Sequence, residues 1–152
     1  MRPRALRHLL VPLLVLVAAC SSHPVGPART YSSYEGKATT TAESALSAVE
    51  TVRLAATAGA GGKASGPYLG EVVSDQEEAL SSVQGTFGSI QPPDGRSDRL
   101  RAELDELISQ SLVHVTDVRV AVRRGELSGL GTTARPLDAD ADALRSFVED
   151  HR

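Results

Sequence analysis

The stretch Asp138-Ala-Asp140-Ala-Asp142 is the pattern in this sequence that most resembles a cation-binding loop. As a calcium loop it would place Asp at positions one, three and five and Glu149 at position twelve. Position six would be Ala143, where the EF-hand requires glycine for its sharp turn. The helix dipole also favours acidic residues in a first turn. We therefore expect a solvated helix N-terminus and no metal site. The alternative interpretation is a calcium site formed by Asp138, Asp140, Asp142 and Glu149.

Other residue types that carry chemistry do not combine into a site. The glycine-rich segment 59–65 invites comparison with a phosphate-binding loop, but Thr57 stands where the first glycine is needed. Ala64 follows Lys63, where a magnesium-binding Ser or Thr is required. No Gly-x-Ser-x-Gly elbow, the motif of a nucleophilic serine, occurs. The four histidines of the chain are His8, His23, His114 and His151, and no two of them have the spacing of metal ligands. The sequence therefore predicts a protein without a cofactor and without enzymatic activity.

The chain begins with a basic region followed by an apolar run. Arg2, Arg4 and Arg7 precede an uncharged stretch at residues 9–19. A helix of that length covers only about half of a ~30 Å hydrocarbon core, at ~1.5 Å per residue. The pattern is typical of a signal peptide and not of a membrane span. The run ends in Val17, Ala18, Ala19 and Cys20, and Cys20 is the only cysteine, so no intramolecular disulfide can form.

These four residues resemble the lipobox of bacterial lipoproteins, with an aliphatic residue, two small residues and an obligatory cysteine. The resemblance covers residues 1 to about 22. It implies that residues 1–19 are removed and that Cys20, carrying fatty acyl chains such as palmitate, becomes the N-terminus. It also implies an extracytoplasmic protein that the lipid on Cys20 holds at the membrane. An ordinary secretory signal with a chance cysteine at this position is the alternative interpretation.

Charge narrows the choice of partners. The full chain has a formal net charge of −3, and removing the three arginines of the signal takes it to −6. An acidic module is a poor candidate for binding nucleic acid or anionic headgroups, so the anchor would be the lipid itself. Only two lysines, against eleven arginines, follow the signal. With the abundant Ala, Gly and Val, that preference is typical of a high-GC, actinobacterial genome.

Apolar residues at helical spacing follow a Pro-containing, flexible spacer at residues 20–30. We expect one domain over residues 31–152, with a first helix at 31–58, a second from Pro67 to about residue 90, a third at 97–124 and a shorter fourth from Pro136. The first helix carries its stripe at Ala38, Ala42, Ala45, Val49, Val52 and Ala56. Stripes on the next three helices include Leu69, Val73, Leu80, Phe87, Leu100, Leu104, Ile108, Val115, Val118, Val122, Leu137, Ala141, Leu144 and Val148.

The β-branched segment 113–122 could also form a strand, but it contains no turn residue and would have no partner strand, so we expect it to be helical. Gly125 is the expected C-terminal cap of the third helix, and residues 125–135 are expected to form a Gly-rich loop. Four stripes joined by short breakers predict an all-α protein, an antiparallel up-and-down four-helix bundle whose shorter fourth helix leaves one end partly open.

The third helix offers the best candidate for a partner surface. With its apolar stripe turned inward, Val113 and Val120 would face outward beside several polar and basic residues, which are Thr116, Arg119, Arg123 and Arg124. Alternatively, this helix is buried on more than one side. We expect a non-enzymatic interaction or structural module of the cell envelope that binds an envelope protein. The rival hypothesis is a lipoprotein that captures a small apolar molecule or a metal ion. The sequence does not predict an oligomeric state.

Overall fold

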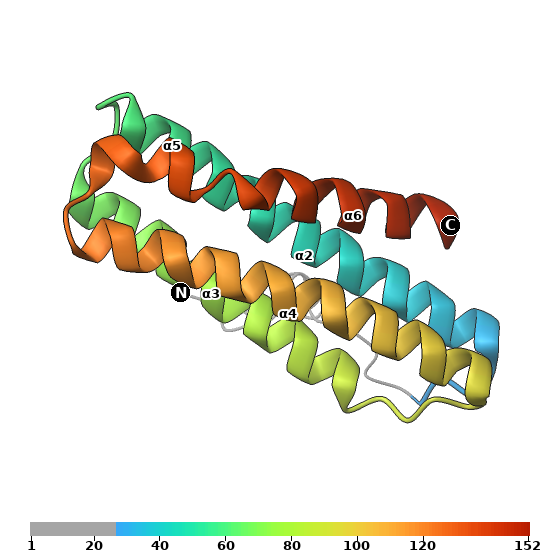
Figure 1. The fold of residues 1–152 in the computed structure, drawn as a ribbon. Coiled ribbons are helices and arrows are strands. Elements are labelled where there is room, and N and C mark those ends of the chain that lie inside the picture. Colours follow the sequence, from blue (N-terminus) through green and yellow to red (C-terminus); the bar gives the residue numbers. More distant parts are fainter. Residues whose placement is uncertain (1–26) are drawn as a thin grey trace, which may run out of the picture.

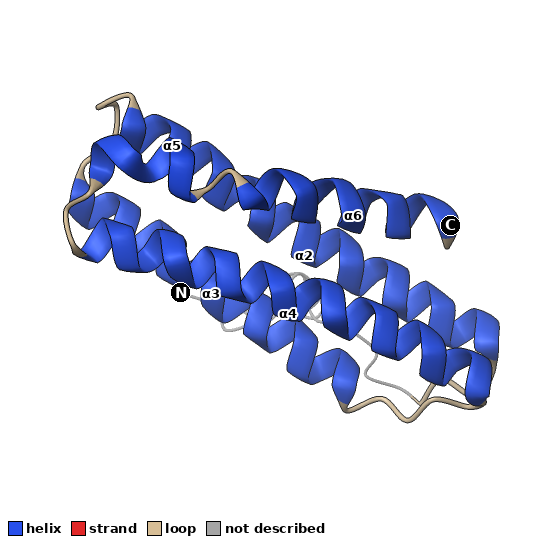
Figure 2. Ribbon diagram, viewed as in Figure 1, coloured by secondary structure: helices blue, strands red, loops and turns tan. Residues whose placement is uncertain are grey.

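The computed structural model describes residues 27–152; the predicted signal peptide, Val17 to Cys20 and most of the spacer lie outside the described residues. Within that range the chain is helical and contains no strand (Figure 2). The helices are α2 (Tyr31–Ala60), α3 (Gly66–Gly88), α4 (Gly95–Arg123), α5 (Leu130–Thr133) and α6 (Pro136–Asp150), with a 3₁₀ turn η1 (Leu127–Gly129). The predicted all-α class is therefore confirmed, and residues 113–122 belong to α4.

Side chains that accept hydrogen bonds from the first turn set where two of the long helices begin. The hydroxyl of Thr30 accepts from the backbone N–H of Ser33 at 3.2 Å, which caps α2. The carboxylate of Asp94 accepts from the backbone N–H of Ser97 at 2.8 Å, which caps α4. Pro67 lies in the first turn of α3, where its missing N–H costs nothing.

Two glycines with left-handed backbone end α2 and α4. Gly62 has φ +67° and Gly125 has φ +74°, a region that residues with a Cβ rarely adopt. After α4, the N–H of Glu126 donates to the carbonyl of Ala121 at 3.0 Å, and an equivalent bond joins Lys63 to Ala58 at 2.8 Å. These bonds form Schellman motifs that satisfy carbonyls left over at the helix ends. The glycine-rich segment after α2 therefore serves as a helix stop.

Helices α2 and α4 lie against each other at the centre, and both α3 and α6 pack on this pair (Figure 1). Helix α3 lies on one side of the pair and α6 on the other, and the four longest helices run in alternating directions along the chain (Figure 1). Because α2 touches all four other helices of residues 27–152, a broad side of it is buried, which its many alanines permit. Within residues 27–152, none of the helices is both long and apolar enough to span a bilayer.

The core consists mainly of the predicted stripes. Fully buried side chains include Leu69, Leu80, Leu104, Ile108 and Leu144. The chain is tightly packed at Gly59, where a Cβ atom would lie 2.7 Å from Cδ1 of Leu69 and 2.8 Å from Cδ1 of Leu130. Only glycine fits this contact between α2, α3 and α5 without displacement of its neighbours.

The prediction that residues 125–135 form a loop is wrong. This segment contains η1 and α5, and both pack against α2 and α4. The physical reason is the pair Leu127 and Leu130, three residues apart, which puts two apolar side chains on one side of a turn. Leu130 is fully buried, and Leu127 packs against the core. The segment therefore continues the fourth side of the protein toward the end where α4 stops.

Candidate functional site

A polar contact with a buried carboxylate joins His114 of α4 to Asp140 of α6. Nδ1 of His114 lies 2.7 Å from Oδ2 of Asp140. The Asp140 side chain is only 3% exposed, whereas the imidazole is 22% exposed. Asp140 follows Leu137 by three residues and precedes Leu144 by four, so it lies on the buried side of α6. A carboxylate in this position requires a polar partner, and His114 provides it.

A histidine whose Nδ1 contacts a carboxylate has a fixed ring orientation, which is the arrangement used by proton-transfer and metal-binding histidines. Either role needs additional groups around Nε2. No cluster of three or more His, Cys, Asp and Glu side chains suited to a metal ion occurs in residues 27–152. The role that the contacts give the pair is to fix α6 against α4.

A network of ion pairs joins α2 to α6 on the surface. Nη1 of Arg53 lies 2.6 Å from Oε2 of Glu50, and the other nitrogens of its guanidinium contact Asp138. Arg145 bridges the same Glu50, at 2.8 Å, and Asp142, at 2.6 Å. Because these side chains are partly or fully accessible to solvent, each pair contributes about 0–1 kcal/mol at most to stability. The network mainly sets how α6 lies on α2.

A shallow depression of about 240 Å³ lies beside this network, between α2 and the α5–α6 connection. Its lining mixes two cations, two carboxylates and small or apolar groups, contributed by Glu50, Arg53, Leu54, Thr57, Gly131, Ala134, Arg135 and Asp138. Ligand pockets usually have ~300–1,000 Å³ and mostly apolar walls. The charged lining suits a small polar molecule better than the apolar ligand considered from the sequence.

The four residues of the calcium candidate are not brought together. Helix α6 is continuous through them, so Asp138, Asp140 and Asp142 point in different directions. Asp138 contacts Arg53, Asp140 contacts His114, and Asp142 contacts Arg145. Glu149 is exposed near the end of the helix. Each aspartate therefore makes a separate contact within the protein.

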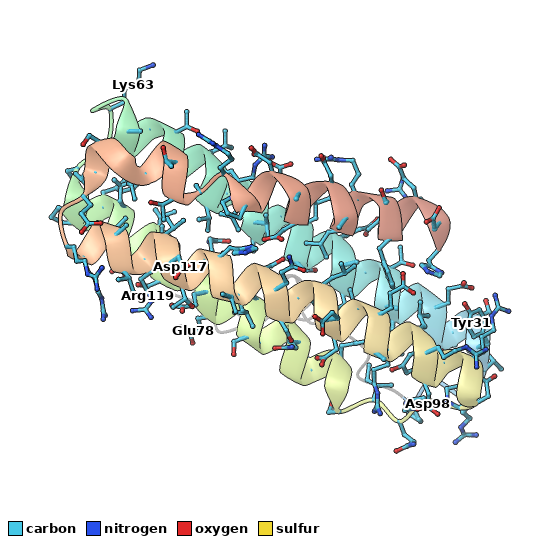
Figure 3. The ribbon with its side chains drawn as sticks, in the orientation of Figure 1. Tyr31, Lys63, Glu78, Asp98, Asp117 and Arg119 are labelled. Atoms are coloured by element: carbon cyan, nitrogen blue, oxygen red, sulfur yellow. The ribbon has the colours of Figure 1, made fainter. Side chains whose placement is uncertain are left out.

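The residues of the predicted partner surface fall into two groups. Thr116 donates a hydrogen bond to Oε1 of Glu77 on α3 at 2.6 Å, and Nε of Arg119 lies 2.5 Å from the other oxygen of the same carboxylate. These two side chains belong to the contact between α3 and α4, a flank on which Figure 3 also labels Glu78 and Asp117. Val113 is 60% exposed, Val120 is half-buried, and Arg123 and Arg124 are exposed.

Polar side chains gather where α2 begins and α6 ends. The Tyr31 hydroxyl donates to Oε1 of Glu35 at 2.7 Å, and Nδ1 of His151 lies 3.3 Å from the same oxygen. The Tyr31 hydrogen bond is the main cause that holds the pKa of the Glu35 carboxyl below its ordinary value. Thr39 donates to the backbone carbonyl of His151 at 2.9 Å. These contacts hold the C-terminal residues on α2.

The sequence interpretation missed the partnership of His114 with Asp140. A signal was present, since Asp140 lies at helical spacing from Leu137 and Leu144, and a carboxylate on a buried stripe needs a partner. The partner could not be identified, because the choice depends on how α4 and α6 align.

Comparison with known proteins gives no further assignment. No protein-family model matches the chain, and neither a curated protein nor a solved structure is significantly similar to it.

Proposed function

We propose that this chain is a lipid-anchored, extracytoplasmic lipoprotein whose helical bundle acts as a non-enzymatic interaction or structural module of the cell envelope. Residues 1–19 are the signal peptide, Cys20 carries the lipid, and residues 31–152 form the module. The sequence of residues 17–20 supports the lipid anchor. In this proposal the long helices form an up-and-down bundle, with η1, α5 and α6 together as its fourth side.

The structural observation behind the proposal is the place in the fold where the described chain begins. The described chain starts at one end of the bundle, where Tyr31 is labelled, and Lys63 lies at the opposite end (Figure 3). A helix of 30 residues, such as α2, is about 45 Å long at ~1.5 Å per residue. A tether at Cys20 would therefore hold one end of the bundle near the membrane and present the other end and the flanks to partners.

The surface supports an interaction role. Within residues 27–152, three large apolar side chains are exposed, namely Leu54 at 71%, Tyr68 at 62% and Val113 at 60%. They lie on three different helices, α2, α3 and α4, and two of them are outside the partner surface expected from the sequence. We retain Val113 and Val120 of α4 as the centre of the proposed contact, with Arg124 at its edge. Thr116 and Arg119 contribute less, because Glu77 already holds them.

The experiment is metabolic labelling of the full chain with a clickable fatty acid in a bacterial host. The wild type and Ser21→Ala, a control beside the lipidation site, should incorporate the label and fractionate with membranes. The Cys20→Ala variant should incorporate no label. Any Cys20→Ala protein from which the signal peptide has been cleaved should be found in the soluble fraction. Label in Cys20→Ala, or absence of label from the wild type, would contradict the proposal.

The interaction role is tested separately by cross-linking in cells. We expect the wild-type chain to yield a specific envelope-protein adduct. If the purified protein instead carries a stoichiometric small molecule in native mass spectrometry and yields no adduct, the ligand-capture alternative replaces the interaction role.

A further inference from the structure

The end of the bundle at which the described chain starts has a charge opposite to that of the rest. We call this the anchor end and define it as residues 27–35 and 88–101, that is, the start of α2, the end of α3 and the start of α4. It contains four arginines, two aspartates and Glu35, a net charge of +1, whereas the remainder of residues 27–152 carries −7. The module is acidic as a whole, but its charge is separated along its length.

Three of these arginines are exposed, and the charge of Arg96 also helps to lower the pKa of the neighbouring Glu35 carboxyl. Arg29, Arg96 and Arg99 are exposed, and within the described residues none of them forms a salt bridge with a carboxylate. The two aspartates are already engaged, since Asp94 caps α4 and Asp98 lies 3.8 Å from Arg101.

The three arginines lie at the same end of the bundle. The guanidinium carbon of Arg96 lies 3.5 Å from the centroid of the Tyr31 ring, a cation–π contact that positions the charge at the start of α2. Arg29 precedes Tyr31 by two residues, and Arg99 follows Arg96 by one helical turn on the same side of α4. Tyr31 and Asp98 are labelled at this same end in Figure 3.

The length of chain before this surface determines what it can reach. Pro27 follows Cys20 by seven positions, with six residues between them, and even a fully extended chain spans at most about 3.6 Å per residue, or ~25 Å in total. Ala28 is buried against the bundle. The residues after Pro27 are therefore held on the bundle and do not add length to the tether. A lipid on Cys20 would therefore keep the anchor end within about 25 Å of the bilayer, a shorter distance than the length of α2.

We infer that Arg29, Arg96 and Arg99 bind the phosphates of anionic lipid headgroups and orient the bundle with its anchor end on the membrane. The inference rests on the proposed lipid anchor at Cys20. The lipid supplies the affinity, and the separated charge supplies the orientation, because an anionic surface attracts the anchor end and repels the acidic remainder. The far end, with Lys63, then points away from the bilayer.

The test uses the acylated protein purified from bacterial membranes. Its Cys20 thiol is consumed by the lipid, so a new cysteine is the only free thiol for a fluorophore. Ser89→Cys labels the anchor end and Ser128→Cys labels the far end, and both positions are exposed. Energy transfer to an acceptor lipid is measured in vesicles of phosphatidylcholine alone and of phosphatidylcholine mixed equally with phosphatidylglycerol.

With phosphatidylglycerol present, we expect strong transfer from position 89 and weak transfer from position 128. Arg29→Gln/Arg96→Gln/Arg99→Gln should lower the ratio of oriented to unoriented protein on the order of ten-fold or more at low salt, and high salt should do the same to the wild type. The matched control, Arg123→Gln/Arg124→Gln/Arg135→Gln, removes three exposed arginines outside the anchor end and should behave like the wild type. Thermal melts confirm that the variants are folded.

Two results would overturn the inference while leaving the lipid anchor in place. One is wild-type transfer that does not depend on phosphatidylglycerol or salt. The other is equal behaviour of the two triple variants, which would assign the effect to net charge. An unmodified Cys20 in the mass spectrum of the starting material would overturn the proposed function, and the orientation with it, before any vesicle is prepared.

Discussion

His114 and Asp140 lie 26 positions apart in the sequence, yet Nδ1 of the imidazole is 2.7 Å from Oδ2 of the carboxylate, across the contact between α4 and α6. Asp140 is the only buried carboxylate within residues 27–152. The pair therefore fixes the alignment of the last helix against the centre of the bundle.

Removing the imidazole alone should be more harmful than removing both polar groups. His114→Leu leaves the Asp140 carboxylate buried without its partner and should lower the free energy of unfolding by on the order of 3 kcal/mol. The double variant His114→Leu/Asp140→Leu replaces the pair by apolar contacts and should recover most of this loss. Urea denaturation of the four proteins of the double-mutant cycle measures both values. A double variant no more stable than His114→Leu would contradict this role.

A fully buried leucine and an exposed leucine give a matched test of the core. Leu104 is fully buried at the centre of α4, and Leu54 is 71% exposed on α2. Leu104→Ala should cost about 2–5 kcal/mol, because it removes buried methyl groups and leaves a cavity. Leu54→Ala should change stability by less than about 0.5 kcal/mol. If thermal and urea denaturation showed similar losses of stability for the two variants, the helices would not pack as described here.

The cap of α4 should make part of the stability depend on pH. The backbone N–H of Ser97 donates to Asp94 and is the main reason that the pKa of this carboxyl lies below its ordinary value. A lowered pKa in the folded state means that the ionised group stabilises the fold above the unfolded value of about 3.9, and that this contribution fades as the pH falls through the folded pKa.

Asp94→Ala should therefore lower the Tm clearly at pH 7 and by a smaller amount in strong acid. The control Glu103→Ala removes an exposed carboxylate from the same helix without removing a cap, and its Tm should differ little from that of the wild type at pH 7. A difference between Asp94→Ala and the wild type that stays constant from pH 7 to pH 2 would contradict the role of the ionised cap.

The outward side of α4 gives a test of the partner surface. Val113 is 60% exposed, whereas Val118 is fully buried on the opposite side of the same helix. Val113→Glu should keep a cooperative melt and lose the envelope-protein adduct in cells. Val118→Glu buries a carboxylate without a partner and should not fold stably. A folded Val113→Glu that still forms the adduct would exclude Val113 from the contact.

Periodicity alone predicted the helices because each stripe is a local property. Ala38, Val49 and Val52 of α2, and Leu104 and Val118 of α4, are all buried as their spacing predicts. The cap at Gly125 was predictable for the same reason, because a glycine directly after an apolar stripe commonly adopts the left-handed conformation.

The contacts that define the candidate site depend on how helices align, and that information is not local. Asp140 could have met any polar group on α2 or α4, and Glu77 of α3 holds Thr116 and Arg119 only because α3 and α4 lie in one particular alignment. Helix α5 was missed because glycines at 125, 129 and 131 argue for a loop, whereas burial of Leu130 against α2 and α4 outweighs their low helix propensity.

The lipid anchor is tested most directly by the intact mass of the protein extracted from bacterial membranes, together with a fragment spectrum of its N-terminus. We expect a chain that begins at Cys20 and carries a diacylglyceryl group on the sulfur, with residues 1–19 absent. A chain that begins elsewhere, or one that begins at Cys20 with a free thiol, would contradict it.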